Sequence, residues 1–433
     1  MYLMQNYLKK QFILQFLVIP IFPVVSKAIV LTEPVTFEQA FQLAVEHSPR
    51  GILLEALQEF ADGQIENAGY KPNPTVGVEI ENVLGTGNFE GLDGSEVTLG
   101  IYQLIERGEK RKGRSELAIR SKELFRWDYE EAIANLRYAV MQAFSNALVA
   151  QKNVELQEEL LELEKASETE VVRRANAALA SSIEVSQAKL ATKQQAFKFG
   201  SSQRQLREAK IILSSLWNQQ NFVDFTLAGQ LEIETPLPDL SALIELVDTV
   251  PSIARFGAER EAQEVAVDLE RPQSKADYKI FGGARYLREG RGDAAFVLGI
   301  EMPWQIRNKN EGNIRSAMSK LHVLDSQKRV VRQQAIAEIS VNYNELASSV
   351  EEWKSLSENL LPSAEAALAE TEIGYQRGIV PLLNVLDARK SLFEIRTAML
   401  ESTGRYLNAQ AEIERLTRPA NTYGRTTSHT RLE

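Results

Sequence analysis

The chain has 433 residues, a formal net charge of −10 and no cysteine. Without cysteine it can form no disulfide, no thiolate metal site, no thiol nucleophile and no lipid anchor on a cysteine. No strongly basic segment stands out, which argues against nucleic acid as a partner.

The first 28 residues have the pattern of a secretory signal peptide. Lys9 and Lys10 supply the positive region, residues 12–25 are almost wholly apolar, and Ser26-Lys27-Ala28 fits the cleavage pattern. The alternative is a transmembrane anchor, but the run is short and contains two prolines. After it, no apolar stretch is long enough to span a bilayer as a helix.

Residues 29–220 read as helix, helix, β-hairpin, long helix, turn and helix. Thr36 is a natural cap for the first helix, and Pro49 separates it from the second. A hairpin is predicted at about 74–104, with alternating strands at Thr75–Glu81 and Val97–Tyr102.

A very long helix follows the first hairpin. Residues 115–199 contain no Gly or Pro, and apolar residues such as Ile133, Leu136 and Val140 recur at three- and four-residue steps. A helix from Ser115 to Ala178 would measure roughly 96 Å. Such long periodicity indicates coiled-coil or bundle packing.

The same order is predicted again after a linker at residues 221–239. The second copy, residues 240–417, has its hairpin at about 277–305 and its helices turn near 378–383. Residues 418–433 are predicted to be a disordered tail.

The two helical turns lie about 200 residues apart and correspond position by position. The first turn, near 178–183, reads Ala178-Leu179-Ala180-Ser181-Ser182-Ile183, and Ser181 with Glu184 forms a possible capping box. In the second, Gly378 suits the end of a helix and Pro381 suits the first turn of the next. A period this long indicates two copies of one large unit.

Two hairpins supply only four strands. Four strands cannot close a membrane barrel, which must leave no open edge, so membrane strands would require a barrel shared between chains. A cyclic trimer would supply twelve strands. A soluble antiparallel sheet remains the alternative from these residues alone.

At these motifs the chain resembles the TolC-like outer membrane efflux protein family, over about residues 36–417. The resemblance rests on Tyr375-x-x-Gly378 with Asn384-Val385-Leu386-Asp387-Ala388, and on Pro72-Asn73-Pro74 before the first strand. Gly108-Glu109-Lys110-Arg111 resembles the heavy-metal (cobalt–zinc–cadmium) branch. Ala178 departs from the family pattern, in which Gly is common.

The resemblance implies a mainly α fold with membrane β: a long α-helical coiled-coil barrel plus a trimer-shared, 12-stranded outer-membrane β-barrel, four strands per chain. It implies a homotrimer in the outer-membrane lipid with its helices in the periplasm. It also implies a periplasmic adaptor (membrane fusion protein) and an inner-membrane pump of the RND type.

The resemblance also assigns the site residues. Asp387 and Asn384 fall where family members carry the aspartates that constrict the closed entrance. The adaptor would dock at the two turns, on Ala178, Ser181, Ser182, Ile183, Gly378, Val380, Pro381 and Leu382. For Asp387 there is a simpler alternative: a solvated helix residue, or one paired with a nearby arginine such as Arg389.

Other motifs carry little. His47, His322 and His429 are scattered, so neither a metal site nor a cofactor is predicted. Arg291-Gly292-Asp293 lies where a hairpin turn expects such residues, and no cluster suggests an enzyme. The many Glu and Lys of residues 151–170 fit a solvated helix face.

The predicted function is a passive exit duct; the alternative is a secreted coiled-coil structural or adhesive protein. The cargo stays open between metal cations, drugs and other substrates.

Overall fold

The computed structural model describes residues 34–218, 224–288 and 292–419, without the side chains of 49–55. The predicted signal peptide, the first residues of the linker and the tail from residue 420 lie outside this part. From Asp224 to Asp239 the linker contains no helix.

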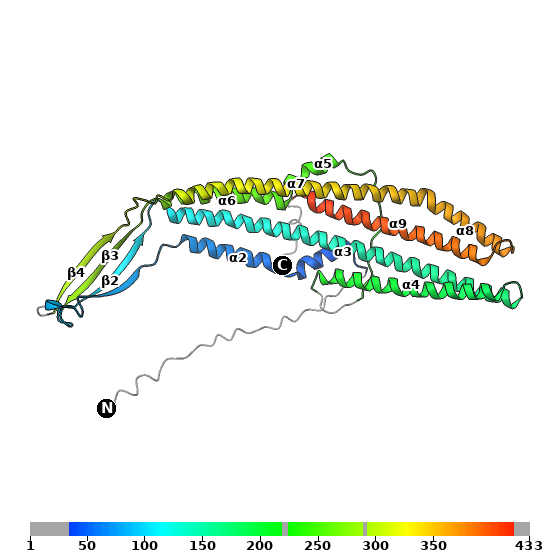
Figure 1. Ribbon diagram of the computed structural model, residues 1–433, viewed down its shortest axis with the longest axis horizontal. Coiled ribbons are helices and arrows are strands. Elements are labelled where there is room, and N and C mark those ends of the chain that lie inside the picture. The colour runs from blue at the N-terminus through cyan, green and yellow to red at the C-terminus, as the bar shows by residue number, and fades with distance from the viewer. Residues whose placement is uncertain (1–33, 219–223, 289–291, 420–433) are drawn as a thin grey trace, which may run out of the picture. The chain divides into compact units, whose positions relative to one another are not determined.

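The first repeat contains four helices and two strands in the predicted order (Figure 1). These elements are α1 (Phe37–His47), α2 (Pro49–Gly69), β1 (Thr75–Glu81), β2 (Glu96–Ile105), α3 (Lys110–Asn176) and α4 (Ser182–Ser215). The long helix thus begins at Lys110 rather than Ser115. Its 67 residues correspond to a length of about 100 Å.

The second repeat has the same order with one interruption. Its elements are α5 (Leu240–Leu246), α6 (Pro251–Gln273), β3 (Tyr278–Leu287), β4 (Asp293–Glu301), α7 (Glu311–Ser355), α8 (Leu361–Gln376) and α9 (Leu382–Thr417). A π-helical turn, Leu356–Leu360, separates α7 from α8. It precedes Pro362, which has no N–H to donate to the carbonyl of Glu358, so the regular ladder cannot continue there.

The four strands form one antiparallel sheet in the order β1-β2-β3-β4. The two hairpins are therefore joined, because β2 pairs with β3 from Glu96↔Leu287 to Ile105↔Tyr278. The prediction of a mainly helical chain with four strands is confirmed. β1 and β4 each have only one strand neighbour in this sheet, so each leaves one edge of backbone groups open.

The helices lie side by side, with the strands at one end and the two helical turns at the other (Figure 1). Apolar clusters of buried side chains lie along them within the part of the chain that the structure describes. Of the residues predicted to face inward on the long helix, Ile133, Leu136 and Val140 are at most 3% exposed. Among the described residues, no helix combines the length and the apolar character needed to cross a membrane.

The two helical turns have the same backbone geometry. Leu179 N donates to Arg174 O (2.8 Å) and Ala178 N to Ala175 O (2.9 Å); 200 positions later Ile379 N donates to Gly374 O (2.8 Å) and Gly378 N to Tyr375 O (3.0 Å). These bonds form a Schellman motif, which requires a left-handed residue after the helix. That residue is Gly378 in one turn (φ 74°) and Ala178 in the other (φ 61°).

Exchanging the left-handed residues should change stability in opposite directions. A Cβ in this conformation costs roughly 1–2 kcal/mol, partly offset by the greater unfolded-state freedom of glycine. We expect Ala178→Gly to stabilise and Gly378→Ala to destabilise by about 1 kcal/mol each, read as opposite shifts in apparent melting temperature in detergent. A Cβ on Gly378 would meet no atom within 4 Å, so the cost there is conformational. Shifts of the same sign would contradict this account.

Candidate functional site

One face of the sheet is apolar and exposed. The register aligns Val76 with Ile101, Ile101 with Gly282, and Gly282 with Leu298. The next row of residues on the same face contains Val78, Leu99, Ala284 and Phe296. Phe296 and Leu298 are 92% and 85% exposed. Contiguous exposed apolar surface of this kind marks contact with a partner or a lipid phase.

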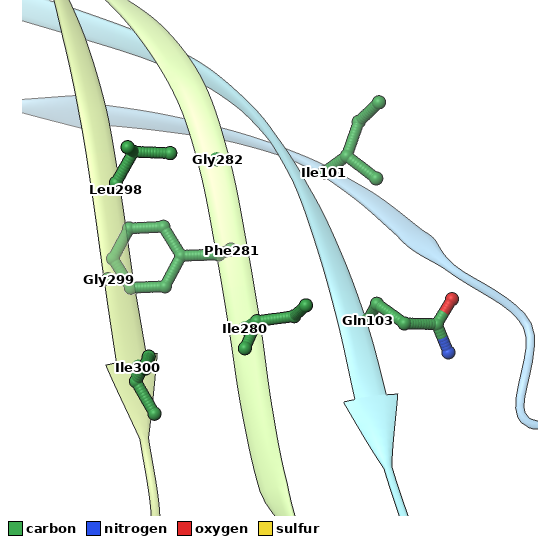
Figure 2. Close-up of a pocket in the computed structure, with 8 residues that line it drawn as sticks. All are labelled: Ile101, Gln103, Ile280, Phe281, Gly282, Leu298, Gly299 and Ile300. Carbon is green, nitrogen blue, oxygen red and sulfur yellow. The ribbon is translucent and has the colours of Figure 1, made fainter.

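A shallow groove of about 630 Å³ lies on this face where Gly282 has no side chain (Figure 2). Ile101, Ile280 and Leu298 are among the side chains that line it. Phe281, the neighbour of Gly282, extends toward Gly299 of β4 (Figure 2) and stacks on Tyr102, with ring centroids 5.4 Å apart.

The opposite face is polar and charged toward the hairpin loops. Arg285 pairs with Glu81 and with Glu96, each at 2.7 Å, and donates to the Thr98 hydroxyl at 2.9 Å. Alternation between an apolar and a polar face along strands of 7 to 10 residues is typical of strands that separate lipid from water.

The Gly108–Arg111 motif lies where the sheet meets the helices. Lys110 is buried and forms an ion pair of 2.8 Å with Asp277, just before β3. Asp277 also accepts from the backbone N of Arg107 at 2.8 Å. The backbone of Glu109 is left-handed. The motif therefore ties the end of the first hairpin to the start of the second.

At the other end, both helical turns expose apolar side chains. Leu179 and Ile183 are 69% and 68% exposed, and Ile379 and Leu383 are 72% and 47% exposed. Of the predicted docking residues, Ala178, Ser181, Ser182, Ile183, Gly378 and Pro381 are exposed and Val380 is half-buried. Together they form the surface that we call the tip.

Leu382 differs from the other predicted docking residues because it is 1% exposed. It packs with Val171 and Ala188, and Tyr375 covers the same cluster. The Arg174 guanidinium lies over the Tyr375 ring, 4.6 Å from its centroid. These contacts join the first turn to the second, so Leu382 supports the tip from inside.

The helices that leave the two turns begin in different ways. Ser181 forms the expected capping box: its hydroxyl accepts from Glu184 N (3.2 Å), and the Glu184 carboxylate accepts from Ser181 N (2.7 Å). Pro381 precedes α9 as its N-cap, so the expectation that it lies in the first helical turn is wrong by one position.

Asp387 and Asn384 lie on α9 above the second turn, and both are exposed. Asp387 lines a groove of about 860 Å³ between α3, α4 and α9, together with Leu383 and Lys390. Within the described residues Asp387 takes part in no ion pair of 4 Å or less.

Arg389 does not pair with Asp387, so the ion pair considered for these two residues is wrong, whereas the exposure of Asp387 agrees with the other alternative, a solvated helix residue. Arg389 is buried and contacts Glu164 of α3 at 3.3 Å and Glu372 of α8 at 3.1 Å. Glu164 is an exception to the solvated face predicted for residues 151–170. The signal in the sequence was its spacing, since it follows Leu160 by four residues and precedes Val171 by seven on the apolar stripe.

Burial raises the pKa of the Glu164 carboxyl above its ordinary value of 4.5, and the nearby Arg389 opposes this only in part. The protonated acid is therefore favoured by folding. Its stabilising contribution is complete below the unfolded-state pKa and is lost as the pH rises through the raised folded-state pKa.

The variant Glu164→Gln, which resembles the protonated acid, should remove this pH dependence. We expect the apparent melting temperature of the wild type, relative to the variant, to fall as the pH rises above about 4.5. Glu162→Gln is the matched control, because the Glu162 side chain is 66% exposed. If the melting temperatures of the wild type and of Glu164→Gln changed in parallel with pH, the raised pKa of Glu164 would be refuted.

Among the residues that the structure describes, no three His, Asp or Glu side chains are grouped to hold a metal ion.

Comparisons with known proteins agree with this geometry. The family model described as outer membrane efflux protein matches residues 263–417, from α6 to the end of α9. The cobalt-zinc-cadmium resistance protein CzcC of Cupriavidus metallidurans is 24% identical over 398 residues, 92% of each chain.

Solved structures share the fold. A structure of CusC matches with a TM-score of 0.70 at 16% identity, over 88% of this chain and 91% of that one. The open-state MtrE outer membrane channel of Neisseria gonorrhoeae matches with a TM-score of 0.68 at 16% identity, over 88% of each. None of these matches supports a secreted structural or adhesive protein. The outer membrane efflux protein family model thus matches residues 263–417, within the second repeat, and the chain shares the fold of these channel structures over 88% of its length.

Proposed function

We propose that this protein is the outer-membrane exit duct of a tripartite efflux system and that it conducts passively. The observation that carries the proposal is the four-stranded sheet, with one apolar face and an open edge on each side. In a membrane every backbone N–H and C=O must be paired, so these edges require further strands. Three copies would close a barrel of twelve strands.

The helices supply the periplasmic part of such a duct. α3 alone runs for about 100 Å from the sheet to the tip. Along α4, Ile183, Leu190, Phe197 and Ile211 are all exposed and spaced at multiples of seven residues. A seven-residue apolar stripe fits a helix of a neighbouring copy, which supports the homotrimer.

The tip is the proposed docking surface for a periplasmic adaptor, which connects the duct to an inner-membrane pump of the RND type. Heavy-metal cations are the proposed cargo, because CzcC is named for cobalt, zinc and cadmium resistance. The Gly108–Arg111 motif adds structural support to the sheet rather than a cargo contact, since Lys110 is occupied by Asp277.

Charge placed on the tip should interrupt docking. We expect Leu179→Glu combined with Ile379→Glu to weaken binding to the cognate adaptor by at least about tenfold, because both side chains are exposed and apolar. Surface plasmon resonance with the purified adaptor measures this. Leu84→Glu is the matched control, since Leu84 is 83% exposed but lies in the first hairpin loop. An equal loss of adaptor binding in the double variant and in Leu84→Glu would exclude the tip as the docking surface.

Asp387 is proposed to constrict the entrance as one carboxylate ring in the trimer. Removing it with Asp387→Ala should raise single-channel conductance or lower the preference for cations by about twofold, since a carboxylate ring attracts cations. Asn384→Asp should strengthen that preference. Glu394→Ala, in the same groove but farther along α9, is the control. Unchanged currents in planar bilayers after Asp387→Ala would remove the gate assignment.

A further inference from the structure

The apolar alternation of β4 continues beyond the end of the strand. β4 ends at Glu301, yet every second side chain from Phe296 onward remains apolar and exposed. The exposed fractions are 92% for Phe296, 85% for Leu298, 74% for Ile300, 56% for Met302, 88% for Trp304 and 71% for Ile306. The apolar surface of the sheet therefore extends into the segment that leads to α7.

The other edge strand shows the same extension. Before β1, the positions in phase with Val76 are Pro74, Pro72 and Tyr70, and Tyr70 is 59% exposed. The register places the start of β1 and the end of β4 at the same end of the sheet, the end from which the chain enters the helices. The Tyr70 hydroxyl donates to Glu66 of α2, so its polar tip is directed back toward that helix.

The length of the apolar surface indicates that these segments help to cover the membrane. The large exposed apolar side chains of β4 itself, Phe296 to Ile300, cover only about 13 Å at about 3.3 Å per residue, or about 10 Å for a tilted strand. Continuing to Trp304 doubles this to about 26 Å, or about 20 Å for a tilted strand, close to the apolar band of about 25 Å of outer-membrane proteins. The strand alone is too short to cover that band.

Charges follow directly after the apolar positions. Arg307 and Lys309 come after Ile306, Lys71 follows Tyr70, and all three are exposed. An aromatic residue next to basic side chains is typical of the membrane–water interface, where the ring lies among the headgroups and the cations reach the phosphates.

We infer that Met302–Ile306, together with Tyr70, is an interfacial anchor that sets the helix-side boundary of the membrane on this protein. Trp304 would lie at the level of the phospholipid glycerol and phosphate groups. A second copy of the chain is the other possible occupant. It would pair with the backbone edges of β1 and β4, whereas these side chains continue the face of the sheet, which stands perpendicular to those edges. The inference rests on the proposed function.

Quenching of tryptophan fluorescence tests the position of Trp304. The chain has four tryptophans, and Trp217 is fully buried. The wild type and Trp304→Phe are reconstituted into phospholipid vesicles with acyl chains brominated close to the headgroup, brominated close to the methyl end, or unbrominated. In the wild type, we expect bromine near the headgroup to quench the fluorescence of Trp304 at least about twofold more strongly than bromine near the methyl end. In Trp304→Phe this quenching should be absent.

Three outcomes would overturn the inference: no quenching in the wild type, equal quenching in Trp304→Phe, or stronger quenching by bromine near the methyl end. Conductance of the same preparations in planar bilayers separates the two proposals. Channels without Trp304 quenching refute the anchor alone, while the absence of both channels and quenching refutes the exit duct as well.

Discussion

The pairing of backbone polar groups at the edges of the four-stranded sheet is the constraint on which the structure depends. One face of this sheet is apolar, and β1 and β4 each leave an edge open. Water can satisfy such edges but lipid cannot, so a membrane location obliges the chain to assemble with copies of itself. The sheet continues into α2, α3, α6 and α7, so the symmetry that closes the strands also arranges the helices.

The internal duplication makes this assembly possible, because it supplies two hairpins per chain. The two repeats differ at the tip. Both turns are Schellman motifs, but Ala178 adopts a conformation that suits Gly378 better. Arg389 joins Glu164 of the first repeat to Glu372 of the second, so α9 is held two residues from the exposed Asp387. A buried charge with two carboxylate partners is costly to separate, and the tip is therefore anchored close to its proposed constriction.

Local periodicity predicted the elements well and their partners poorly. Strand Thr75–Glu81 and the capping box of Ser181 and Glu184 were predicted as they occur, because each depends on residues close in sequence. The ion pairs of Glu164 with Arg389 and of Lys110 with Asp277 were not predicted, because each joins residues more than 160 positions apart. Pro381 was misplaced by one position, since proline's fixed φ is compatible with both the N-cap and the first turn.

The sequence by itself determined the repeat, the helix and strand periods, the four strands and the position of each helical turn, because all of these follow from spacing along the chain. Only the tertiary structure decided that the two hairpins share one sheet and that Leu382 supports the tip from inside. These features depend on register and burial between distant segments, and no local pattern encodes which residues meet there.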